Sequence, residues 1–136
     1  MIPNYEIHAL SQIKGIGPSR IHKICNYCKH INSIEDFNRN ELLNIDGITK
    51  SIYSKIISSD FNESIKLIEN HKTEGIDYIT PFDSKYPQLL KSIYNPPIGL
   101  FARGEIQFEK PIAIVGSRNI TQYGKKITSI LTLELI

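Results

Sequence analysis

The sequence predicts an α/β protein, with an all-helical amino-terminal part followed by the opening of a parallel α/β domain. Residues 1–60 carry one helical pattern twice. The run Ile112–Val115 is short, apolar and continuous, which is typical of a strand buried on both faces of a parallel sheet. A further helical pattern begins near Thr121. We therefore expect two domains, at residues 1–75 and 76–136.

The internal repeat has an offset of 32 positions, and each copy predicts a helix, a glycine-containing hairpin and a second helix. The matching residues are Leu10, Ile13, Gly15, Ile16, Gly17, Ile21 and Ile24 in the first copy and Leu42, Ile45, Gly47, Ile48, Thr49, Tyr53 and Ile56 in the second. The repeat therefore predicts two similar helical units in tandem.

The first copy fits a helix-hairpin-helix motif, a module that grips the nucleic-acid backbone without reading its sequence. Gly15 permits a positive φ where the first helix ends. Gly17 lets a phosphate approach the backbone N–H groups of the next helix, and Pro18 suits the first turn of that helix. The expected DNA contacts are Lys14, Gly15, Gly17, Arg20 and Lys23. The alternative is that this turn is scaffold or a protein-contact surface.

The second copy differs from the first at two positions of its hairpin. Asp46 stands where the first copy has Lys14, and Thr49 stands where it has Gly17. A carboxylate beside the hairpin repels phosphate. We therefore expect the second copy to be the structural half of a paired motif.

The middle of the chain predicts shorter elements. A helix is expected over Asn62–Lys72, with Gly75 as its C′ residue and as the domain boundary. Short strands are expected at Ile76–Thr80 and Ile98–Ala102, because these segments contain residues that are favoured in sheets. A short helix is expected between them, at Tyr86–Ile93.

The end of the apolar run Ile112–Val115 predicts an anion-binding site. The chain turns at Gly116 and enters a helix near Thr121, where unpaired backbone N–H groups and the positive end of the helix dipole converge. A hydroxyl donor and a guanidinium follow the glycine, and both suit phosphate oxygens. The expected phosphate-binding residues are Gly116, Ser117, Arg118, Tyr123, Gly124 and Lys125.

Alternative roles stay open for several of these residues. Arg118 can pair with a carboxylate, in which case the turn is only a turn. Tyr123 can stack on a base, an interaction worth about 1–3 kcal/mol, or it can pack in a core. Lys125 can add to the positive charge of Arg118 or can simply be solvated.

Two nucleotide-binding loops are excluded by their spacing. A P-loop requires a glycine where this sequence has Asn119 and a hydroxyl where it has Lys126. A dinucleotide-binding loop requires glycines where it has Arg118 and Thr121. We expect no cofactor. We also expect no catalytic residues, because all four histidines lie far from Ser117 in the sequence and no paired carboxylates flank Gly116.

The composition is ordinary for a soluble globular protein, with 40% hydrophobic and 22% charged residues. The net charge of +2 is too small to indicate nucleic-acid binding by itself. No apolar stretch is long enough for a membrane span, and the amino terminus lacks the pattern of a signal peptide. We expect a cytoplasmic protein with no membrane partner.

The pair Cys25 and Cys28 has the spacing of a redox pair or half a zinc site. Both residues lie on the same helical stripe as Ile21, Ile24 and Ile31, and the chain has no second cysteine pair. We therefore expect two reduced core cysteines, which behave as small hydrophobes, and no metal site.

The turn at Gly116 and the segment that leads to it resemble one protein family. The turn contributes Gly116-Ser117-Arg118, Thr121, Tyr123 and Gly124. The approach contributes Asp83, Tyr86-Pro87, Leu89-Leu90, Ile93, Pro96-Pro97, Leu100 and Gly104. In order and spacing, these residues resemble the DNA-processing protein A family (DprA, also called Smf) over roughly residues 76–126.

The resemblance implies a Rossmann-like domain that binds single-stranded DNA without sequence preference. It also implies protection of incoming DNA, loading of a RecA-type recombinase in natural transformation, and a homodimeric full-length protein. The last apolar helical pattern has no C-cap, so we expect an amino-terminal fragment of such a protein. Two alternatives stay open: an enzyme of a related Rossmann-like fold that binds or hydrolyses phosphonucleotides, and a protein-interaction role for the helical half.

Overall fold

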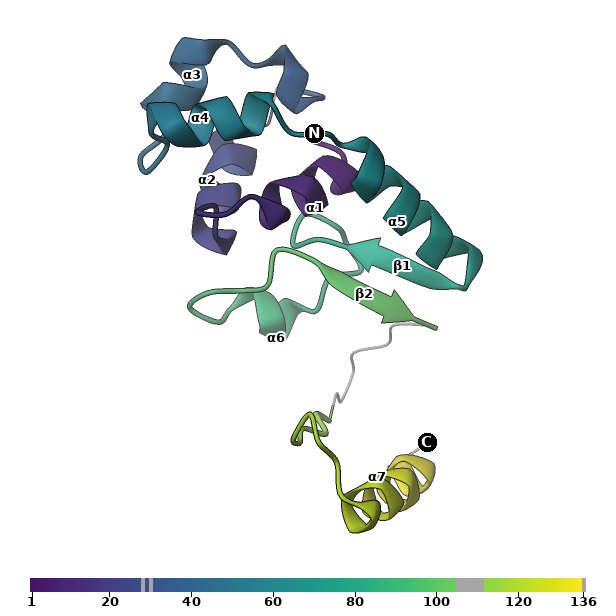
Figure 1. Ribbon diagram of the computed structural model, residues 1–136. Coiled ribbons are helices and arrows are strands. Elements are labelled where there is room, and N and C mark those ends of the chain that lie inside the picture. The colour runs from purple at the N-terminus through teal and green to yellow at the C-terminus, as the bar shows by residue number, and fades with distance from the viewer. Residues whose placement is uncertain (28, 30, 105–111, 136) are drawn as a thin grey trace. The chain divides into compact units, whose positions relative to one another are not determined.

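The computed structural model describes residues 1–27, 29, 31–104 and 112–135. The chain forms two compact units, Met1–Ile106 and Gln107–Ile136. The first unit contains a helical part and a small sheet, and the described part of the second contains one helix (Figure 1).

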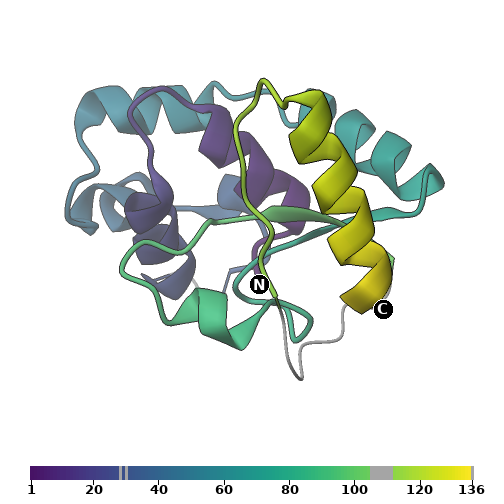
Figure 2. The ribbon, with the colours of Figure 1, turned by 90° about the horizontal axis from the view of Figure 1, so that it is seen from below.

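Four helices of the first unit form the predicted repeat. Up to Thr73, the helices are α1 (Asn4–Gln12), α2 (Pro18–Tyr27), the 3-10 helix η1 (Ile34–Asp36), α3 (Arg39–Asn44), α4 (Lys50–Ile57) and α5 (Asn62–Thr73). The first copy forms α1, a glycine turn and α2, and the second copy forms α3, a glycine turn and α4. Helix α1 lies in the middle of the unit and packs against both α2 and α5 (Figures 1 and 2).

The turn of the first copy, which we call hairpin 1 (residues 13–17), is closed by two backbone hydrogen bonds. The Ile13 N–H donates to the Leu10 carbonyl (3.2 Å), and the Ile16 N–H donates to the Ile13 carbonyl (3.0 Å). Gly15 has a φ of +100°, in the left-handed region that glycine adopts without strain. The positive φ predicted for Gly15 is therefore confirmed.

The turn of the second copy, hairpin 2 (residues 45–49), is closed in the same way. The Ile45 N–H donates to the Leu42 carbonyl (3.2 Å), and the Ile48 N–H donates to the Ile45 carbonyl (3.0 Å). Gly47 has a φ of +88°. The two copies therefore share their backbone geometry as well as their sequence pattern.

The helical core draws on both copies of the repeat. Leu10 and Leu42 occupy equivalent positions, and both are fully buried. Cys25 is also buried, as predicted, whereas Cys28 lies outside the described residues.

The sheet of the first unit has two antiparallel strands, β1 (Ile76–Ile79) and β2 (Leu100–Arg103), in which Tyr78 is opposite Phe101. The short helix α6 (Gln88–Lys91) lies between them in the sequence. Helix α5 packs against β1 (Figure 1). This mixture of helices and a small sheet is compatible with the predicted α/β class.

A cluster of four rings joins α1, α5 and the sheet. The His8 ring meets the Tyr78 ring edge-on, with 5.2 Å between centroids, and the His71 ring lies 4.7 Å from the Phe101 ring. His8 Nδ1 also lies 2.9 Å from the Ser64 hydroxyl oxygen on α5. Helices α1 and α5 therefore each contribute a histidine ring to the cluster.

The close fit of Tyr78 depends on a glycine that lies just before β2. A Cβ atom at Gly99 would overlap the Tyr78 hydroxyl group, so glycine is required at this position. Burial raises the pKa of Tyr78 to about 12.

The parallel sheet expected from Ile112–Val115 is not present in the described part of the chain. These residues form no strand, and the side chains of Ile112 and Val115 are 67% and 90% exposed. A buried strand requires a neighbouring strand to take its backbone hydrogen bonds, and the described residues include none that does so. The prediction of a buried strand is wrong for this structure, and the Rossmann-like arrangement is not confirmed.

The described part of the second unit consists of residues 112–121, which have no helix or strand, and α7 (Gln122–Leu135). Thr121 caps this helix. Its hydroxyl oxygen accepts from the Gly124 N–H (3.1 Å), and its carbonyl accepts from the Lys125 N–H (2.9 Å). The helix start predicted near Thr121 is confirmed.

Candidate nucleic-acid interface

The turn that follows Gly116 is organised by Ser117. The Ser117 hydroxyl oxygen accepts a hydrogen bond from the Asn119 N–H at 3.2 Å, which fixes the residues on either side of Arg118. This bond uses a lone pair of the hydroxyl and leaves its hydrogen available as a donor. The turn can therefore offer a hydroxyl donor and a guanidinium from adjacent residues.

Arg118 and the start of α7 form a basic stretch within the second unit. In residues 112–135, Arg118 makes no ion pair, and the first turn of α7 contains no acidic residue. Lys125 and Lys126 follow in the second turn. Cations near a helix amino terminus oppose the helix dipole, so an anion bound there would relieve an unfavourable arrangement.

Tyr123 and Gly124 take different positions in the first turn of α7. Tyr123 is 74% exposed, so its ring is open for stacking. A Cβ atom at Gly124 would come within 3.2 Å of the Ile120 side chain, so this glycine makes room for the chain that enters the helix. A phosphate contact by Gly124 stays a prediction.

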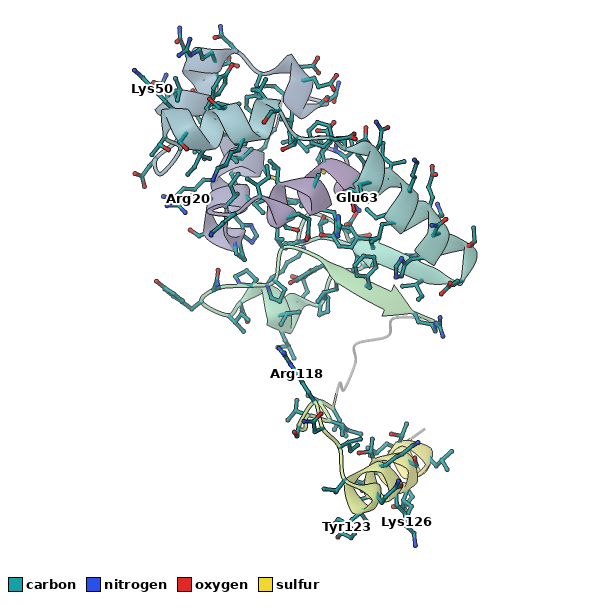
Figure 3. All side chains as sticks on the ribbon, in the orientation of Figure 1. Arg20, Lys50, Glu63, Arg118, Tyr123 and Lys126 are labelled. Carbon is teal, nitrogen blue, oxygen red and sulfur yellow. The ribbon has the colours of Figure 1, made fainter. Side chains whose placement is uncertain are left out.

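The predicted residues of the second unit do not converge on one point. Figure 3 shows Arg118 projecting from the turn, whereas Tyr123 projects from the amino-terminal part of α7, as does Lys126, the neighbour of the predicted Lys125. Such an arrangement suits an extended ligand better than a single phosphate group.

In the first unit, Arg20 has a role that the sequence did not reveal. Its Nε donates to the Gly47 carbonyl at 3.0 Å, and a terminal nitrogen donates to the Gly15 carbonyl at 2.7 Å. Arg20 therefore joins hairpin 1 to hairpin 2. A Cβ atom at Gly47 would lie 3.1 Å from the Arg20 Nε, so glycine permits this close approach.

Lys23 is also engaged with hairpin 2, because its ammonium group forms an ion pair with Asp46. The hydrogen bond and the charge of Lys23 lower the pKa of the Asp46 carboxyl group. Lys14, by contrast, has an exposed side chain, while its carbonyl accepts from the Lys55 ammonium group at 3.1 Å.

An open groove with a volume of about 370 Å³ lies between the two hairpins. The residues that line it are Gly17, Ser19, Arg20, Lys23, Asp46 and Gly47. The structure thus brings three of the predicted contacts, Gly17, Arg20 and Lys23, to one surface. Sequence reasoning missed Asp46 and Gly47 as parts of this surface, although the change of charge between positions 14 and 46 was a visible signal.

The described residues include neither a cluster of metal ligands nor a membrane-spanning helix. They contain no group of three or more His, Cys, Asp or Glu side chains that is placed to hold a metal ion. None of their helices combines the length and apolar character needed to cross a membrane.

Comparisons with known proteins point to DNA metabolism. Residues 77–136 match the family described as DNA recombination-mediator protein A. The chain is 40% identical over 93 residues to the DNA processing protein DprA of Bacillus subtilis (strain 168), which covers 66% of this chain and 31% of that protein. It is 26% identical over 135 residues to Protein Smf of Synechocystis sp. (strain ATCC 27184 / PCC 6803 / Kazusa), covering 94% and 34% of the two chains.

The chain spans about a third of the length of these two curated relatives. No solved structure is significantly similar to it.

Proposed function

Because the chain belongs to the DNA recombination-mediator protein A family (DprA/Smf), we propose that it binds single-stranded DNA without sequence preference. The family is one of DNA processing and recombination. For the whole protein, the proposal extends to the protection of incoming DNA, the loading of a RecA-type recombinase and a homodimeric state. The role is one of binding, without turnover.

The observation that carries the proposal is the basic stretch of the second unit. Arg118 lies in a turn whose serine hydroxyl can donate, and the adjacent helix begins without an acidic residue. A guanidinium binds phosphate oxygens through two parallel N–H bonds, and no acidic side chain in the first turn of α7 competes for it. Gly116, Ser117 and Arg118 would therefore hold one backbone phosphate.

The remaining predicted residues extend the contact along the DNA. Tyr123 would stack on a base, because an exposed aromatic ring accepts any base on its face. Lys125, beside Gly124, would attract the next phosphate by charge. This combination of charge and stacking gives affinity without base readout, which fits binding that ignores sequence.

Hairpin 1 would supply a second and weaker contact to the DNA backbone, through Lys14, Gly15, Gly17 and Lys23.

We further propose that residues 1–75 act as a separate helical domain, and that Ile112–Val115 become a strand of a Rossmann-like sheet when neighbouring strands are present. A strand of a parallel sheet needs a neighbouring strand and a covering layer on each face, and the described residues do not supply them.

Replacement of Arg118 tests the proposal. We expect Arg118→Ala to weaken binding of a fluorescein-labelled oligothymidylate by about 1–3 kcal/mol, the range for a hydrogen bond to a charged group. The slope of log K against log salt should become shallower by about 0.7, the value for one lost phosphate contact to a single strand. Fluorescence anisotropy across a salt series measures both.

Arg103→Ala is the matched control, because it removes the same charge from β2, where Arg103 is exposed and lies 3.8 Å from Glu74. It should leave the affinity close to that of the wild type. Equal binding by the Arg118→Ala variant and the wild type at low salt would remove Arg118 from the site.

A further inference from the structure

Each copy of the repeat has a lysine that contacts the hairpin of the other copy. Lys23 and Lys55 occupy equivalent positions of the two copies, as do residues 14 and 46. Lys23 reaches residue 46 of hairpin 2, and Lys55 reaches residue 14 of hairpin 1. The second helix of each copy thus sends a lysine to the hairpin of the other copy.

The exchange is unequal because the residues at positions 14 and 46 carry opposite charges. Lys55 meets Lys14 and can bond only to its backbone carbonyl, at 3.1 Å. Lys23 meets Asp46 and bonds to its carboxylate. An acid therefore neutralises the ammonium group that faces the groove between the hairpins.

We propose that Asp46 is an internal anion that occupies the place of a nucleic-acid phosphate on Lys23 and so regulates access to the hairpin groove. The inference rests on the proposed function, since it assumes that the ligand is the backbone of single-stranded DNA. It adds a gate at the hairpins, which the proposed function does not contain.

The groove has the chemistry that a phosphate requires once Asp46 moves away. Lys23 supplies a charge and Ser19 a hydroxyl, while Gly17 leaves the backbone open to close approach. Arg20 is held by the carbonyls of Gly15 and Gly47, so the groove keeps its shape without Asp46.

Asp46 is free to move because it contributes nothing to the core. The side chain of Asp46 is 91% exposed, and that of Lys23 is 45% exposed. Among the described residues, the Asp46 carboxylate bonds only to Lys23. An exposed ion pair of this kind is a weak interaction. A strand that carries many phosphates can therefore displace the single carboxylate.

The test is Asp46→Asn in the whole chain, measured with the fluorescein-labelled oligothymidylate across a salt series. We expect about fivefold tighter binding at low salt, which is the effect of about 1 kcal/mol that one unit charge exerts at close range in water. We also expect the slope of log K against log salt to steepen by about 0.7, because Lys23 gains a phosphate.

The matched control is Asp77→Asn. Asp77 is also an exposed aspartate that faces a lysine, with Lys85 at 3.9 Å, but it lies on β1. The control changes the net charge by the same amount and should leave the salt slope unchanged. An equal gain in affinity in both variants would show a general charge effect and would overturn the proposal.

Two further variants separate the gate from the site at Arg118. The gain from Asp46→Asn should disappear when Lys23→Gln is added, and it should persist when Arg118→Ala is added. A gain that survives Lys23→Gln, or an Asp46→Asn variant that binds no better than the wild type, overturns the gate. The Arg118→Ala variant alone decides the proposed function, so the two can fail separately.

Discussion

His8 is a half-buried histidine at the contact between the helices and the sheet. Burial lowers the pKa of His8, and the nearby His71 lowers it further. The folded protein therefore favours the neutral ring, which lies against Tyr78 and beside the Ser64 hydroxyl. The unfolded chain has no such preference, so acid shifts the balance between the two states.

We expect the melting temperature to fall as the pH drops below about 6.5, the ordinary pKa of histidine. In that range the unfolded state binds more protons than the folded state, so stability rises with pH and is lost on acidification. Thermal denaturation followed by circular dichroism between about pH 7.5 and about pH 5.5 measures the slope.

His8→Gln should flatten this slope, because glutamine does not titrate. Burial also lowers the pKa of His22, so some of the slope should remain until His22→Gln is added. A His8→Gln variant with the full slope of the wild type would show that His8 does not contribute to it.

At the scale of elements, the two hairpins are held together by Arg20. One of its hydrogen bonds reaches the nearby Gly15 carbonyl in hairpin 1, and the other reaches the Gly47 carbonyl in hairpin 2, 27 residues away in the sequence. Lysine carries the same charge but lacks the planar fork that serves both carbonyls at once. Arg20 therefore has a structural role in joining the two hairpins, and its contact with DNA stays a prediction.

We expect Arg20→Lys to lower the free energy of unfolding by about 1–3 kcal/mol, the range for hydrogen bonds that involve a charged group. Urea denaturation followed by circular dichroism measures the loss. Arg39→Lys is the control, because the Arg39 guanidinium lies 5.7 Å above the Tyr53 ring, where a lysine can replace it. Equal stability of the Arg20→Lys variant and the wild type would contradict a role for Arg20 in holding the two hairpins together.

The elements that could be predicted from the sequence are those whose causes are local. The glycine turns, the helix start at Thr121 and the strand at Ile76–Ile79 each follow from a few neighbouring residues. The strand at Ile112–Val115 was predicted from its apolar residues alone. Its formation depends on partner strands, which a local pattern does not contain.

The same distinction explains the candidate site. The residues after Gly116 could be identified because they follow one another in the chain. The engagement of Arg20 and Lys23 with Gly47 and Asp46 could not, because it depends on how the two copies pack.

At the scale of the whole molecule, the described parts of the two units differ in how their backbone is held. The strands β1 and β2 pair with each other, and α5 packs against β1. Among the described residues, Ile112–Val115 make no backbone hydrogen bond. Local stability should therefore vary strongly along the chain.

Amide hydrogen exchange should show this difference. We expect slow exchange in α1 and in the paired strands, because opening them requires unfolding of the core. Ile112–Val115 should exchange on the order of the intrinsic rate of an open chain. Mass spectrometry of peptic peptides measures both in one experiment. Strong protection at Ile112–Val115 in a monomer would contradict the structure of this segment.

The reciprocal lysines have a consequence for how the two copies of the repeat can differ. A symmetric dimer built from one copy of the hairpin would carry the same residue at both of the positions that are now Lys14 and Asp46. Because both copies lie in one chain, position 14 can be basic while position 46 is acidic. Under the proposed gate, this difference is what lets hairpin 2 carry an anion that competes with a DNA phosphate for Lys23 of the first copy.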